Sequence, residues 1–97
     1  MAGPVDLLWS EDALADLDRF AGFLQAQSPE LAAVVADAII SRTQLLSRYP
    51  KLGRPISGRE EYRQIVLQVL GGAYVFHYRY DGSRVVVLHV FHARELR

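Results

Sequence analysis

The spacing of apolar residues changes once along this chain, near Pro50, and that change limits the folds available to it. Before Pro50 the apolar residues recur every three or four positions, which is the period of an amphipathic helix. After Pro50 they alternate with polar residues, which is the period of a strand with one buried face. We therefore expect helices first and an antiparallel sheet after them, which is an α+β arrangement.

A short strand and two helices are expected before Pro50. The apolar run at residues 5–9 indicates the strand, and Ser10 after it is a favourable N-cap for the first helix. Ser28 and Pro29 supply the N-cap and the first-turn proline of a second helix, which continues until Pro50 stops it. The residues expected on the two inner faces, with Asp16 pointing elsewhere, are Leu14, Leu17, Phe20, Ala21 and Leu24, and then Ala32, Val35, Ala36, Ile39 and Leu46.

Three strands are expected after a polar loop that is rich in glycine, proline and charge. Gly71-Gly72 and Asp81-Gly82 supply two-residue hairpin turns between these strands. The loop covers residues 50–61, and the strands cover residues 63–69, 73–80 and 84–91. We therefore predict a single domain over residues 1–97, in which a helical hairpin packs on one side of a small, mainly antiparallel twisted sheet in the order β-α-α-β-β-β.

The charges of the chain are divided between its two halves. Residues 1–40 carry seven acidic residues and one arginine, whereas residues 41–97 carry ten basic and four acidic residues, so net charges of −6 and +6 cancel. A neutral total argues against broad nonspecific binding to nucleic acid, while the basic half can still receive an acidic partner. The alternative is that these charges are only the solvated faces of helices and strand edges.

The chain contains no cysteine, which excludes disulfides, thiolate zinc sites and a cysteine nucleophile. It has neither a basic start followed by an apolar run nor the apolar segment of about 18 residues that a membrane span requires. We therefore expect a cytoplasmic protein that does not contact a membrane.

Histidines and carboxylates are the remaining candidates for chemistry. His89 and His92 lie three positions apart on a strand, so they should point to opposite faces and cannot bind one metal ion. His77 stands among aromatic and valine residues, where a hydrogen-bonded structural role is favoured over catalysis. Glu60 and Glu61 fall in the predicted loop and indicate a solvated turn. We expect neither a metal site nor a cofactor.

Cations form the group of residues best suited to a binding surface. They are Arg54 in the loop, Arg63 at the start of a strand, and His92, Arg94 and Arg97 at the end of the last strand. Such side chains either contact phosphates and carboxylates or protect the edge of a sheet from aggregation. Because the strand that begins at Arg63 and the last strand both neighbour the middle strand, Arg63 and Arg94 share one surface if the register allows.

Several segments, each unremarkable alone, follow one another in an order that is typical of a known family. They are the strand ending at Trp9, the helix segment Ala13-Leu14-Ala15-Asp16-Leu17, Ser28-Pro29, Tyr49-Pro50, Gly53-Arg54-Pro55, Arg63, Tyr74-Val75-Phe76-His77-Tyr78 and Val87-Leu88-His89-Val90-Phe91-His92-Ala93-Arg94. With these segments the chain resembles the RelE/ParE superfamily of bacterial toxins over nearly its whole length. The Gly-Arg-Pro loop and the His-x-Arg ending are most similar to ParE-like members.

This resemblance implies that the chain is the toxin of a type II toxin–antitoxin pair. A ParE-like toxin inhibits DNA gyrase by binding to it, and a cognate ParD-like antitoxin neutralises the toxin. The antitoxin is expected to dock an apolar helix or strand beside the helical hairpin or the sheet edge, and the toxin reaches operator DNA only through it. For the target-binding surface we expect Arg54, Arg63, His92 and Arg94.

Two alternatives remain open. Superfamily members that cleave messenger RNA on the ribosome carry a basic catalytic surface, whereas this chain has a single lysine, Ala73-Tyr74 in the place of an arginine, and few residues after Arg94. In an mRNA endonuclease of the RelE type, His92, Arg94 and Arg63 would supply acid–base catalysis and phosphate binding. The third hypothesis is a non-toxic member that binds its antitoxin and acts only in operon autoregulation.

Overall fold

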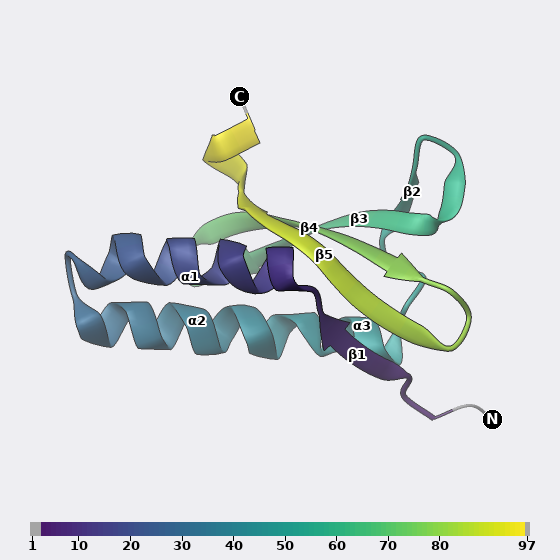
Figure 1. Cartoon of the computed structure of the whole chain (residues 1–97), viewed down its shortest axis with the longest axis horizontal. Coiled ribbons are helices and arrows are strands. Elements are labelled where there is room, and N and C mark those ends of the chain that lie inside the picture. Colours follow the sequence, from purple (N-terminus) through teal and green to yellow (C-terminus); the bar gives the residue numbers. More distant parts are fainter. Residues whose placement is uncertain (1–2, 97) are drawn as a thin grey trace.

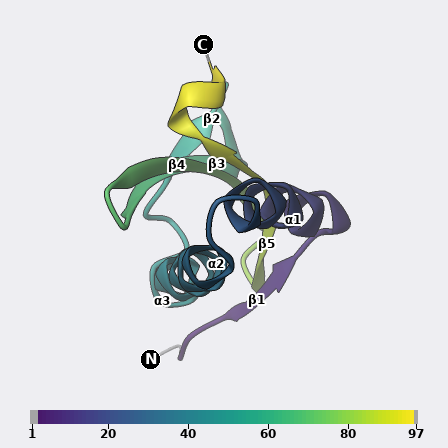
Figure 2. The same ribbon diagram turned by 90° about the vertical axis from the view of Figure 1, so that its left-hand side faces the viewer.

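The computed structural model describes residues 3–96, without the side chains of Glu95 and Leu96. Its elements are β1 (Asp6–Trp9), α1 (Glu11–Gln25), α2 (Pro29–Thr43), α3 (Leu45–Arg48), β2 (Arg54–Ile56), β3 (Arg59–Val69), β4 (Gly72–Tyr80), β5 (Arg84–His92) and the terminal 3-10 turn η1 (Ala93–Leu96). The helices α1 and α2 run side by side on one side of the sheet, as the views along and across them show (Figure 1 and Figure 2). Apart from α3, β2 and η1, this is the predicted order β-α-α-β-β-β.

Five strands form one sheet in the order β1-β5-β4-β3-β2. The edge strand β1 lies parallel to β5, and the other neighbours are antiparallel. Helix α1 packs along β5 and α2 packs against β3, so the hairpin covers one face of the sheet. The predicted α+β class with a mainly antiparallel sheet is confirmed. Within residues 3–96, none of the helices has both the length and the apolar content that crossing a membrane requires.

Both long helices begin at the predicted serines. Ser10 has an extended backbone, and its hydroxyl oxygen accepts a hydrogen bond from the main-chain nitrogen of Ala13 at 3.1 Å. Ser28 caps α2 in the same way through the nitrogen of Leu31 at 3.2 Å, and Pro29 follows in the first turn. Each cap satisfies a helix N–H that has no partner within the helix, which fixes where the helix begins.

The inner face of α1 differs from the prediction at three positions, the first of which is Ala13, a fully buried residue that was not predicted to face inward. Leu14 is 48% exposed, whereas Asp16, which was expected to point away, is 8% exposed. The strand β5 continues beyond the last residue that β1 pairs with, and one carboxylate oxygen of Asp16 accepts a hydrogen bond from the edge nitrogen of Val90 at 2.9 Å. The other oxygen contacts Arg19 Nη1 at 2.8 Å. The sequence pattern missed this residue because a buried carboxylate at a strand edge interrupts the helical period.

The second helix is interrupted, although one helix was expected up to Pro50. It ends at Thr43, and the short helix α3 follows after Gln44. The buried Thr43 hydroxyl donates to the carbonyl of Ile40 at 2.7 Å, and Gln44 N donates to Ser41 O, three residues back. A threonine hydroxyl that bonds to the preceding turn competes with the helical pattern, and three-residue spacing tightens the chain. Only the predicted continuity is wrong, since α3 still buries Leu46.

The predicted loop at residues 50–61 contains a hairpin. β2 pairs with the beginning of β3, and the connection is made by Ser57 and Gly58, both with positive φ (52° and 75°). Two successive positive φ values are typical of a type I′ turn, but serine is a weak signal for one. The prediction that Glu60 and Glu61 form a solvated turn is therefore wrong. Both residues belong to β3, and Glu61 accepts a hydrogen bond from Arg79 Nε at 2.9 Å.

A bulge in β5 determines which of its residues face the helices. His77 of β4 pairs with His89 while the next residue of β4, Tyr78, pairs with Val87, so Leu88 is the extra residue. The bulge reverses the alternation, because one inserted residue turns every later side chain to the other face. As a result Val85, Val87 and Val90 are all buried in the core, and His92 also turns toward the helices, opposite Tyr74.

Candidate interaction surface

A hollow of about 450 Å³ lies between α1 and the end of β5. It is mainly apolar and carries cationic groups at its rim. Its lining residues are Arg19, Phe20, Phe23, Leu24, Tyr74, His92 and Arg94. This places two of the four predicted target-binding residues, His92 and Arg94, in one site.

Aromatic side chains form the floor of this hollow. The Tyr74 ring stands edge-on to Phe20 with ring centres 5.5 Å apart, and edge-on to His92 at 5.1 Å. The main-chain nitrogen of Arg94 donates to His92 Nδ1 at 3.1 Å, so Nδ1 acts as an acceptor in this arrangement. Phe23 is 68% exposed at the rim, although an aromatic ring of this size normally gains free energy from burial.

The rim of the hollow carries arginines from two elements. The Arg19 guanidinium lies 4.9 Å from the centre of the Phe20 ring and is held there by Asp16. Arg94 approaches from η1 on the other side. Burial raises the pKa of Asp16, but the hydrogen bonds from Val90 and Arg19 outweigh burial and hold this pKa below its usual value, so Asp16 stays charged and keeps Arg19 in place. The arrangement suits a ligand group that is apolar with a carboxylate beside it.

Arg63 does not join this surface. Its residue is 6% exposed, and its Nη1 atom donates to the main-chain carbonyls of Gly53 at 2.7 Å and Lys51 at 3.3 Å. In the sheet Arg63 pairs with Tyr78, whereas His92 pairs with Tyr74, four residues away along β4. At about 3.3 Å per residue this is a separation of about 13 Å along the strand. Arg63 and Arg94 were expected to share one surface only if the register allowed it, and the register does not bring them together.

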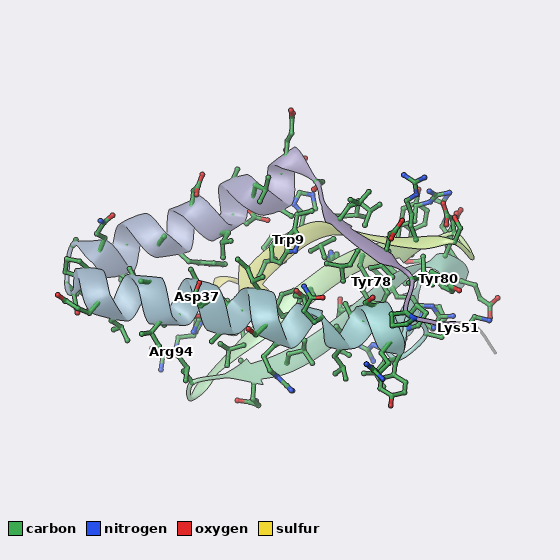
Figure 3. The ribbon with its side chains drawn as sticks, turned by 90° about the horizontal axis from the view of Figure 1, so that it is seen from below. Trp9, Asp37, Lys51, Tyr78, Tyr80 and Arg94 are labelled. Atoms are coloured by element: carbon green, nitrogen blue, oxygen red, sulfur yellow. The ribbon has the colours of Figure 1, made fainter. Side chains whose placement is uncertain are left out.

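Arg54 is exposed, but it lies on the edge strand β2, opposite Gln64 of β3. Figure 3 shows how far this region is from the hollow: Lys51, which precedes it in the chain, lies at one end of the molecule, and Arg94 lies toward the other. The four predicted residues thus form two groups: His92 and Arg94 line the hollow, whereas the exposed Arg54 and the buried Arg63 belong to the paired strands β2 and β3. Arg97 lies outside the described residues.

The face of the sheet away from the helices carries the other two histidines. His77 Nε2 lies 3.0 Å from Gln64 Oε1, and His77 packs edge-on against Phe91. Burial, and then the neighbouring His89, lower the pKa of His77, so it is neutral at pH 7. His89 stacks on Phe91 and its Nδ1 lies 3.4 Å from Asp16. The hydrogen bond predicted for His77 is present, and His89 and His92 face opposite sides of the sheet as predicted. Among residues 3–96 no three histidine or carboxylate groups are close enough together to hold a metal ion.

Comparison with known proteins identifies a family. The family model described as ParE toxin of type II toxin-antitoxin system, parDE, matches residues 7–97. The chain is similar to the chromosomal ParDE TA system from P. aeruginosa, with 23% sequence identity and a TM-score of 0.73 over 91% of this chain and 95% of that one. It is also similar to the toxin-antitoxin complex RelBE2 from Mycobacterium tuberculosis, with 23% identity and a TM-score of 0.60 over 93% and 99% of the two chains. No curated protein matches the sequence. At this identity the two structures show a shared fold.

Proposed function

Because this chain belongs to the ParE toxin family of type II toxin–antitoxin systems, we propose that it inhibits DNA gyrase by binding to it. The observation that carries this proposal is the hollow with His92 and Arg94, which is mainly apolar and has a cationic rim. Aromatic and arginine side chains around an apolar centre are typical of surfaces that bind proteins. The toxin would act in the bacterial cytoplasm, where this target works.

The antitoxin partner follows from the family. We propose that a ParD-like antitoxin covers the hollow with an apolar segment that carries carboxylates, since Phe23 is 68% exposed beside the mainly apolar hollow. The segment would dock beside α1 of the helical hairpin. Operator DNA would be bound only through the antitoxin, because the toxin has no net charge to attract DNA by itself.

The proposal is tested with toxin that has been separated from its antitoxin. Purified gyrase should lose supercoiling activity as toxin is added, and the antitoxin should restore it. Arg94→Ala should weaken both this inhibition and the growth arrest caused by induced expression, while its melting temperature stays close to that of the wild type. Arg84→Ala, which changes an exposed arginine at the start of β5, the strand that leads to η1, is the control and should inhibit like the wild type. Full inhibition by Arg94→Ala would remove this residue from the surface.

A second candidate function is ribosome-dependent cleavage of messenger RNA. It is favoured by the position of His92, which lines the same hollow as Arg94. A neutral imidazole and a guanidinium could assist proton transfer and phosphate binding in an attack by a ribose hydroxyl. Cleavage of mRNA on programmed ribosomes, abolished by His92→Ala, would support this function, and intact mRNA would exclude it.

A further inference from the structure

The loop between α3 and β2 is held in place through its main chain. We call residues 49–54 the 49–54 loop. The carbonyl of Pro50 accepts from the Tyr78 hydroxyl at 2.7 Å, Lys51 O accepts from Arg63, and Gly53 uses both its nitrogen and its carbonyl. Leu52 N donates to Tyr49 O at 3.0 Å. Each residue from 50 to 53 therefore has a fixed main-chain group, which leaves the loop little conformational freedom.

Apart from the bond between Leu52 and Tyr49, these hydrogen bonds are made by two buried polar side chains of the sheet, Tyr78 and Arg63. Tyr78 is fully buried, and burial raises the pKa of its hydroxyl, which stays neutral and can donate to the loop while it accepts from Gly53 N at 2.9 Å. Arg63 is charged and buried, which is unfavourable unless its hydrogen bonds compensate. A Cβ atom at position 53 would lie 2.8 Å from the Tyr78 hydroxyl, so only glycine allows the loop to approach this closely.

The outer surface of the same loop is apolar and cationic. Tyr49 is 55% exposed and Leu52 is 52% exposed. They border a shallow hollow of about 390 Å³ that is also lined by Pro50, Lys51 and Tyr80. Residues 42–59 contain five basic residues (Arg42, Arg48, Lys51, Arg54 and Arg59) and no acidic one. The loop thus presents two large apolar side chains beside the cations Lys51 and Arg54, while Glu60, Glu61 and Asp81 line a neighbouring hollow on the other side of Lys51.

We propose that the 49–54 loop is a preformed docking element that binds a carboxylate-bearing, partly apolar surface on the protein that the toxin poisons. A loop already fixed in its bound shape loses little conformational entropy on binding, which favours affinity. Tyrosine and cationic side chains around an apolar group are suited to binding a protein surface. A phosphate backbone, in contrast, offers no apolar surface against which the leucine of the loop could be buried. Arg63 and Tyr78 are positioning residues of this element. The inference rests on the proposed function for the identity of the target.

The test compares loop variants with matched controls elsewhere on the toxin. The loop variants are Leu52→Ser and the double variant Lys51→Glu, Arg54→Glu. The controls are Val66→Ser, at an equally exposed apolar residue on the far face of the sheet, and Arg84→Glu. Growth arrest on induced expression, inhibition of purified gyrase and affinity for the antitoxin are measured for each variant. We expect both loop variants to need more than about ten-fold more toxin for half-inhibition. Their antitoxin affinity, and both activities of the controls, should stay within about two-fold of the wild type.

Each other outcome identifies what is wrong. Loop variants that arrest growth and inhibit gyrase like the wild type would overturn the inference and leave the proposed function intact. Loop variants that lose antitoxin binding but keep inhibition would show that the loop binds the antitoxin. Loop variants that lose binding to a labelled DNA duplex would show that it binds nucleic acid. Wild-type toxin that arrests growth without inhibiting gyrase would refute the proposed target. In that case, loss of growth arrest in the loop variants would still show that the loop contacts the true target, and retained growth arrest would show that it does not.

Discussion

Replacing Asp16 with alanine should destabilise the toxin more than any other change of an α1 acid. The carboxylate accepts from Val90 N at 2.9 Å and pairs with Arg19 Nη1 at 2.8 Å, and its side chain is 11% exposed. A hydrogen bond from a buried N–H to a charged acceptor contributes about 1.5 to 3 kcal/mol. The half-exposed pair with Arg19 adds only about 0.3 to 0.5 kcal/mol, because solvent screens it. We expect a loss of about 2 to 3.5 kcal/mol in the free energy of unfolding.

Urea denaturation followed by circular dichroism measures this loss, with Asp18→Ala as the control. Asp18 is exposed on the same helix, so the gain in helix propensity from alanine is the same in both variants and cancels. The melting temperature of Asp16→Ala should fall by about 10 to 25 °C. If the free energies of unfolding of the two variants differ by less than about 0.5 kcal/mol, the hydrogen bond from Val90 N to Asp16 does not stabilise the fold as proposed.

The stability difference between the wild type and Asp16→Ala should also depend on pH. The pKa of Asp16 is lower in the folded protein than its ordinary value of 3.8, so its ionised form is preferentially stabilised by folding. The contribution of Asp16 is therefore complete above the unfolded pKa and is lost as pH falls through the folded value. The stability difference between wild type and Asp16→Ala should be constant from pH 7 to about pH 5 and should shrink below about pH 4. A difference that grows on acidification would contradict this sign.

The remaining stability predictions concern two close contacts of the main chain. Gly53→Ala should destabilise the protein by about 1 to 3 kcal/mol in urea denaturation, because the new Cβ would lie 2.8 Å from a main-chain carbonyl. Its control, Gly22→Ala on the open surface of α1, should stabilise the protein by about 0.5 to 1 kcal/mol. Equal effects of the two variants would show that the close contact at Gly53 does not matter. Ser10→Ala should lower the free energy of unfolding by about 1 to 2 kcal/mol, because the hydroxyl both caps α1 and donates to Leu88 O at 3.1 Å. The exposed Ser41→Ala is its control, and a Ser10 variant as stable as this control would show that neither bond contributes.

The sequence predicted the layers of this fold because periodicity and helix caps are local signals. The change of period at Pro50, the caps at Ser10 and Ser28, and the alternation of β4 all depend on residues within a few positions of each other. The errors lie where a local signal is too weak to see in the apolar pattern, or where a distant contact decides the local structure. Thr43 interrupts the helix from within the core, and β2 forms only because β3 is present to pair with it.

The candidate site was predictable only in part, for a related reason. Sequence reasoning selected His92 and Arg94, which lie two residues apart and stay together in the structure. It did not find Phe23, although an aromatic residue outside the inner face of α1 was a usable signal. The opposite case is Arg63, whose burial depends on a register that no local pattern reveals, so its role changed from contact residue to support of the 49–54 loop.

We propose that this ParE-family toxin acts by binding gyrase, and two parallel assays on one toxin preparation distinguish this action from cleavage of messenger RNA. Toxin freed from its antitoxin is titrated into a gyrase supercoiling reaction, and the same preparation is added to ribosomes carrying messenger RNA. We expect supercoiling to be lost, the mRNA to remain intact, and Arg94→Ala to weaken the inhibition. Cleaved mRNA with unaffected supercoiling would rule out gyrase as the target and would make His92 and Arg94 catalytic candidates.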